Sequence, residues 1–166
     1  MSTLTALNNP LGDLAAASGR ALKEVFSKQL KLQILQSPVK DVLSTIEGKL
    51  LHSAVSINGE KISGTVLLQV PELLAQRVTE IMLGSKGDAE EIRDVTGELC
   101  NMIAGRVKAE LHASGFPATL GTPTVSIGQR IALQLRGEAQ LSSTDWSVEG
   151  DQTGDFNLQV QIRIIS

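Results

Sequence analysis

Residues 62–84, ISGTVLLQVPELLAQRVTEIMLG, combine a strand pattern and a helix pattern that meet at a proline. The first part is continuously apolar from Val66 to Leu68, which is typical of a strand that is well covered by the rest of the fold. Pro71 suits the first turn of a helix, Glu72 suits the positive end of the helix dipole, and Gly84 suits its termination. The stretch therefore predicts a strand followed directly by a helix.

The segments on either side of this stretch supply further helices and strands. Upstream, AVSING ends in Asn58-Gly59, a pair that favours a tight hairpin turn into the next strand. The pattern elsewhere predicts a helix over 11–30, a long helix over 90–114, strands over 124–129 and 130–141, a polar hairpin loop over 142–155 and a final strand over 156–165.

The two halves of the chain resemble each other weakly. Residues 64–70, GTVLLQV, share a glycine, a leucine, a glutamine and a valine with residues 154–160, GDFNLQV. Ser18-Gly19-Arg20 likewise resembles Ala104-Gly105-Arg106, in the same helix-then-strand order. We therefore predict an α/β fold of the α+β type with a pseudo-two-fold repeat. One domain over residues 1–166 would hold a mainly antiparallel sheet, two long helices and a shorter one.

Composition narrows the range of functions. The chain has 166 residues, a net charge of −3 and only 2% aromatic residues, which argues against nucleic acid as a partner. Cys100 is the single cysteine, so no disulfide within the chain and no cysteine-based zinc site is expected. The sequence carries neither a signal peptide pattern nor an apolar run long enough to span a membrane, and we expect a cytoplasmic protein.

One side of the long helix differs from the rest of its circumference. Asp94, Glu98, Asn101 and Gly105 fall within a stripe about 60° wide, while most of the remaining positions are apolar. Gly97 and Gly105 each cost about 1 kcal/mol relative to alanine inside a helix, and asparagine is also unfavourable there. Close approach of another backbone would account for the glycines, but a solvated face would account for the polar residues. The pattern alone leaves both interpretations open.

The run D-x-x-x-E-x-x-N-x-x-x-G over residues 94–105 resembles the signature helix of the CheC/CheX/FliY family of phosphatases. These enzymes act on the phosphorylated chemotaxis response regulator CheY. The longer string DVTGELCNMIAGRVKAEL is most similar to the CheX branch. Residues 57–84 before it and GTPTVSIG after it are similar as well, so that the resemblance extends over about residues 10–165.

The resemblance implies a function and a set of site residues. Glu98 and Asn101 occupy the positions of the family's two catalytic residues, and Asp94, Gly97 and Gly105 are expected to contact the partner. The implied partner is a phosphorylated CheY-like response regulator that holds Mg²⁺ in its own acidic cluster, and the chain itself is expected to need no cofactor or metal. A homodimer with exchanged β elements is implied too.

The resemblance also implies that the first helix lacks a second copy of the site. Aligning Gly19-Arg20 with Gly105-Arg106 places Gly12 and Ala15 where that copy would need glutamate and asparagine. One active helix agrees with the CheX branch of the family.

Two other functions are open at this point. A non-catalytic module that binds CheY-like proteins, or a flagellar-switch-type interaction module, would have the same fold. A hydrolase or transferase acting on a small molecule is disfavoured because the sequence has no G-x-S-x-G, H-E-x-x-H or dinucleotide-binding glycine motif.

Overall fold

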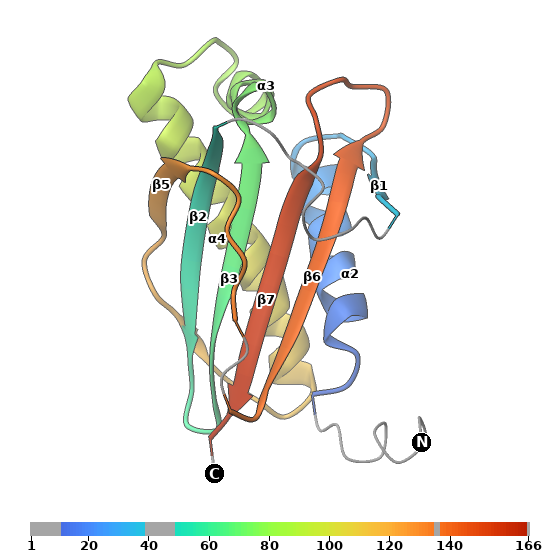
Figure 1. Cartoon of the computed structure of the whole chain (residues 1–166), viewed down its shortest axis with the longest axis vertical. Helices are drawn as coiled ribbons and strands as arrows, with labels where there is room; N and C mark the ends of the chain where they lie inside the picture. The colour runs from blue at the N-terminus through green and yellow to red at the C-terminus, as the bar shows by residue number, and fades with distance from the viewer. Residues whose placement is uncertain (1–10, 39–48, 135–136, 166) are drawn as a thin grey trace.

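The computed structural model describes residues 11–38, 49–134 and 137–165. The described strands form one antiparallel sheet with the order β1-β6-β7-β3-β2, and β4 and β5 both pair with β2. Helices α2 and α4 lie against one face of the sheet, and α3 lies at its end (Figure 1). The α+β fold expected from the sequence is therefore confirmed.

The bounds of the elements agree with most of the predicted ranges. In chain order they are α2 (Leu14–Gln29), β1 (Ile34–Gln36), β2 (Leu50–Asn58), β3 (Ile62–Pro71), α3 (Glu72–Leu83), α4 (Ala89–Ala113), β4 (Thr119–Leu120), β5 (Thr124–Gly128), β6 (Ala139–Val148) and β7 (Phe156–Ile164). Gly84 ends α3 in the left-handed conformation, with φ +76°, as its position in the sequence predicted. The β2–β3 turn is shifted along the chain from the expected Asn58-Gly59, because Asn58 pairs with Ser63 and the Gly59 N–H donates to the Ile62 carbonyl at 2.9 Å, which leaves Glu60 and Lys61 at the tip.

The sheet consists of two copies of one unit, a helix followed by three strands, and the strands of the two copies pair with each other. Helix α2 with β1, β2 and β3 corresponds to α4 with β5, β6 and β7, and the first strand of each unit pairs with the hairpin of the other. At the centre of the sheet Leu68 pairs with Leu158, which is its own counterpart in the sequence repeat. The pseudo-two-fold axis passes close to this pair.

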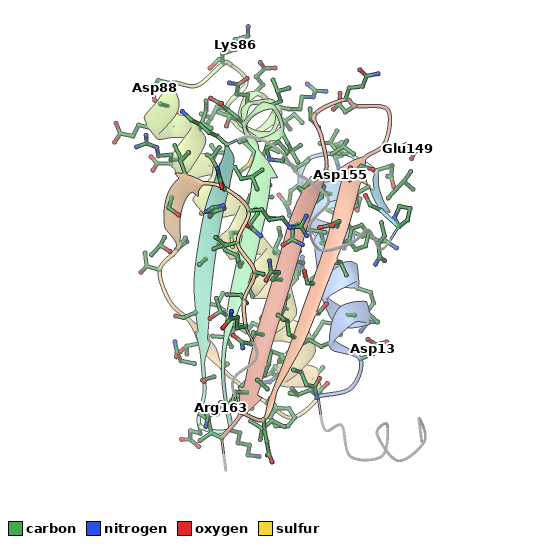
Figure 2. All side chains as sticks on the ribbon, in the orientation of Figure 1. Asp13, Lys86, Asp88, Glu149, Asp155 and Arg163 are labelled. Atoms are coloured by element: carbon green, nitrogen blue, oxygen red, sulfur yellow. The ribbon has the colours of Figure 1, made fainter. Side chains whose placement is uncertain are left out.

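The same pseudo-two-fold axis relates the two long helices, α2 and α4. Asp13 begins α2 at one end of the molecule and Asp88 begins α4 at the other end, so the helices run antiparallel (Figure 2). Arg20 on α2 binds Glu110 through two 3.0 Å hydrogen bonds. In the reciprocal contact, Arg106 on α4 lies 3.6 Å from Glu24 on α2. The sequence echo at Gly19-Arg20 and Gly105-Arg106 therefore corresponds to two equivalent contacts between the helices.

Strand β6 corrects the sequence-based prediction for residues 142–155. These residues were expected to form a polar loop, but residues up to Val148 continue β6, which pairs with β7 as far as Trp146 and with β1 over 146–148. Trp146 is 2% exposed and packs under α2, where its ring lies 3.5 Å from the position a Cβ would take at Gly19. Its indole N–H donates to the Thr144 hydroxyl at 2.8 Å. The polar serines and threonines concealed a strand whose buried positions are Ser142, Trp146 and Val148.

Residues 130–134 form no strand, although a strand was predicted over 130–141. They cross the sheet face that the helices leave open and are held there by side-chain amides. Gln69 accepts from the Ile131 N–H at 2.8 Å and donates to the Ile131 carbonyl at 2.9 Å. Gln159, the repeat counterpart of Gln69, accepts from the Leu133 N–H at 2.7 Å. Buried amides thus satisfy backbone groups that a neighbouring strand would otherwise pair.

Candidate functional site on helix α4

Helix α4 begins and ends with clear local signals. The Asp88 side chain accepts from the Glu91 N–H at 2.8 Å, and Glu91 accepts in return from the Asp88 N–H at 3.2 Å. This capping box satisfies two of the N–H groups that a helix leaves open at its start. At the other end, Gly115 has φ +90°, a conformation that glycine adopts without strain.

The inner side of α4 fixes the helix against the sheet. Its buried apolar residues are Val95, Leu99, Cys100, Ile103, Ala104, Val107 and Leu111. The Cys100 thiol lies 3.3 Å from the Ser53 carbonyl of β2, and burial raises the pKa of this thiol to about 12. Cys100 is therefore a protonated thiol among apolar residues. It contributes to the packing of the helix and is not a nucleophile.

The outer side of α4 carries the predicted row. Asp94 and Glu98 are exposed, while Asn101 and Gly105 are half-buried. Glu98 and Asn101 are three residues apart, about 4.5 Å along the helix axis, so both side chains leave the helix on one edge. Within the described part of the chain, neither side chain makes a hydrogen bond or an ion pair. The edge offers a carboxylate and a carboxamide to whatever covers it.

The two glycines of this helix have different surroundings. A Cβ at Gly105 would meet nothing within 4 Å, so the helix surface there is open. Gly97 is buried, and a Cβ there would lie 3.2 Å from Val125 of β5 and 3.5 Å from Pro123. The close approach expected at Gly97 is thus made by the chain's own β5 strand. The prediction of a partner contact is corrected for Gly97, which instead sets how closely α4 packs on β5.

The equivalent surface of α2 carries no such row. Gly12 lies outside the helix, with φ +71°, because Asp13 caps α2 and the first helical residue is Leu14. Ala15 is exposed but has no functional group, and Gly19 faces the Trp146 ring. The position that needs a glutamate is therefore neither acidic nor helical, in agreement with one site on α4.

The described residues carry no built metal centre. No group of three or more histidine, cysteine, aspartate or glutamate side chains among them is arranged to hold a metal ion. None of the helices within the same ranges is both long enough and apolar enough to cross a membrane.

Comparison with known proteins identifies the family. The model of the family "Chemotaxis phosphatase CheX" matches residues 51–145, more than half of the chain and including all of α4. The chain belongs to the CheX family. A comparison with curated proteins gives no match for this CheX-family chain.

Solved structures agree with the fold. CheX from Vibrio vulnificus has a TM-score of 0.76 and 22% identity, and the match covers 94% of this chain and 100% of that one. CheX from Desulfovibrio desulfuricans gives 0.70 and 23%, covering 92% and 99%. The CheX–CheY–BeF3–Mg complex from Borrelia burgdorferi gives 0.68 and 18%, covering 91% and 98%.

Two further residues on this side of α4 were missed by the sequence analysis. Lys108 and His112 follow Gly105 at spacings of three and seven residues, which keeps them close to the same stripe. The helical periodicity places both residues close to the stripe, but they follow the family motif, which ends at Gly105. The row is therefore longer than the four residues first predicted.

Proposed function

We propose that this CheX-family protein hydrolyses the aspartyl phosphate of a CheY-like response regulator. The observation that carries the proposal is the edge of α4 on which Glu98 and Asn101 lie one turn apart, exposed or half-exposed, without a partner among the described residues. Such an edge suits a macromolecular substrate, because a convex helix can enter the regulator's phosphorylated pocket.

Asn101 would position the attacking water. Hydrolysis of an acyl phosphate needs a water in line with the scissile bond, and placing that water rigidly removes part of the entropic barrier. A carboxamide can both accept a hydrogen bond from the water and donate one to the phosphoryl oxygens. Because it is neutral, it also avoids the repulsion that a carboxylate would meet beside the phosphate.

Glu98 would fix the helix on the regulator. Its carboxylate is the natural partner for a lysine ammonium, and the active-site lysine of the regulator lies next to the phosphoryl group. A charge-assisted hydrogen bond between the two groups would set the distance from Asn101 to the acyl phosphate. The chemistry needs no metal of this chain's own, and the Mg²⁺ would be held by the regulator's acidic cluster.

The proposal is tested by following phosphate loss from acyl-phosphorylated CheY-like regulators, with and without the protein. Accelerated loss from at least one regulator is the expected result. Binding without acceleration would instead favour the non-catalytic interaction module, which shares the fold.

Replacing Glu98 with alanine is expected to weaken binding of the phosphorylated regulator by about 30-fold or more, since removal of one partner from a desolvated charge pair costs about 2–5 kcal/mol. The same change removes the repulsion between Asp94 and Glu98, which are four residues apart, so thermal stability should not fall. The measurements are KM for the regulator and the melting temperature. Glu60→Ala, in the exposed β2–β3 turn, is the matched control; equal KM values for both variants would contradict the docking role.

We further propose that the protein is a cytoplasmic homodimer with exchanged β elements. Strands β1 and β5 lie towards opposite edges of the sheet, where Leu35 and Ile127 are 55% and 49% exposed. Edge strands carry unpaired backbone groups that a second chain can complete. Light scattering after size exclusion should give twice the 17.6 kDa of one chain; a mass of one chain at micromolar concentration would refute the dimer.

A further inference from the structure

Charge is segregated along the exposed side of α4. Its N-terminal part is acidic, its middle is neutral at Asn101 and Gly105, and its C-terminal part is basic or titratable. In order, the charged or titratable members are Glu90, Asp94, Glu98, Lys108 and His112.

This arrangement does not stabilise the helix by itself. Glu90, Asp94 and Glu98 follow one another at four-residue spacing, where like charges face each other and destabilise a helix. Lys108 has no acidic residue three or four positions away in either direction. The helix dipole acts within the first and last turns, whereas Asp94 and Lys108 each lie five residues inside the ends of α4.

On the side of α4 that faces α2, the charged residues form ion pairs. Where the helix meets α2, Glu110 is paired with Arg20 and Arg106 with Glu24. In contrast, no ion pair within the described ranges involves Asp94, Glu98 or Lys108. Among the described residues, α4 thus pairs its charges on the side that faces α2, whereas Asp94, Glu98 and Lys108 on the other side form no ion pair.

We propose that Lys108 determines the orientation in which the regulator docks, by binding a carboxylate on the regulator's surface. The inference rests on the proposed function and extends it to a second contact point. With Asn101 at the acyl phosphate, Lys108 lies seven residues further on, about 10 Å along the helix axis. The partner is therefore a regulator that carries an acidic side chain about 10 Å from its phosphorylated aspartate, on the side away from its active-site lysine.

Two opposite charges at fixed separation make the docking directional. In the correct orientation, Glu98 meets the regulator's lysine and Lys108 meets its carboxylate. Reversing the helix would bring like charges together at both points, which is the means by which charged surfaces exclude wrong complexes. A regulator without the carboxylate would be bound weakly even if its phosphorylated pocket were identical.

The test measures binding of a CheY-like regulator loaded with beryllofluoride and Mg²⁺, which mimics the phosphorylated state without hydrolysis. Lys108→Glu should raise Kd about tenfold and reduce the salt dependence of the association rate, as expected for a peripheral charge contact. Lys108→Arg, which keeps the charge, should restore binding. The control is Lys86→Glu, which makes the same change in net charge in the turn before α4 (Figure 2), about 30 Å from Lys108 along the helix.

The outcomes separate this inference from the proposed activity. If Lys108→Glu and Lys86→Glu bind as the unaltered protein does, the orientation role is wrong, whatever the phosphatase assay gives. If the unaltered protein binds the loaded regulator but releases no phosphate from the phosphorylated one, the activity is wrong and Kd still decides the role of Lys108. Changing one acidic surface residue of the regulator to lysine should rescue Lys108→Glu, and that residue is the contact. Failure of every such change to rescue would overturn the proposal.

Discussion

Asn101→Ala should lower kcat for regulator dephosphorylation by about 10²-fold or more, a loss of the size seen when one preorganised polar group is removed from a reacting centre. The alanine side chain can neither accept from a water nor donate to the phosphoryl group, so the attacking water is no longer held in line. The measurement is single-turnover loss of acyl phosphate at saturating protein. Binding of the beryllofluoride-loaded regulator should change much less than kcat.

The same substitution should leave the fold intact or make it slightly more stable. Asn101 makes no hydrogen bond with the described residues, and alanine is a better helix former by about 0.5–0.7 kcal/mol. Asn101→Asp keeps the shape but adds a negative charge beside the phosphate, so it should be at least as slow as the alanine variant. Retention of more than half the rate in either variant, with normal stability, would remove Asn101 from the mechanism.

Trp146→Ala should destabilise the protein by about 3–5 kcal/mol, a large part of the roughly 5–15 kcal/mol that stabilises an ordinary domain. The ring is 2% exposed, packs against α2 beside Gly19, and has the Lys23 ammonium 5.7 Å from its centroid. Its removal leaves a cavity between β6 and α2 that rigid neighbours fill only in part. Urea unfolding followed by circular dichroism measures the loss.

The controls for this experiment use side chains of known exposure. Trp146→Phe retains an aromatic ring at the site and should cost much less than the alanine change. Leu73→Ala removes a leucine that is 60% exposed on α3 and should change stability by less than about 0.5 kcal/mol. If Trp146→Ala behaves like Leu73→Ala, the tryptophan lies on the surface in solution, as the loop interpretation of residues 142–155 would require.

Much of the fold was predictable because several segments have strong local signals. Helix α4 is 25 residues long, with a regular apolar face and a row of polar residues, so both its existence and its exposed edge follow from periodicity. Strand β3 and helix α3 are joined by Pro71 and ended by Gly84, which act through backbone conformation alone. The resemblance between residues 64–70 and 154–160 predicted a duplicated unit, and the two segments pair with each other at the centre of the sheet.

The segments that were predicted wrongly depend on contacts distant in sequence. Residues 130–134 alternate like a strand, but Gln69 and Gln159 bind their backbone across the open face, where no neighbouring strand is available. Residues 142–148 are rich in serine and threonine and resemble a loop, yet they pair with β7 and β1 and place Trp146 beneath α2. In each case the partner, rather than the local pattern, sets the conformation.

The sequence by itself determined the α4 edge with Glu98 and Asn101, because the 3.6-residue period fixes which side chains share one side of a helix. It also determined the duplicated order of helix and strands, because both copies keep enough of the same residues. Only the tertiary structure decided that Gly97 packs on Val125 while Gly105 is open. It also decided that α4 pairs Arg106 and Glu110 with α2, while Asp94, Glu98 and Lys108 form no ion pair within the described ranges. Those properties depend on which surface lies a few ångströms away, and that distance is set by the packing of the whole chain.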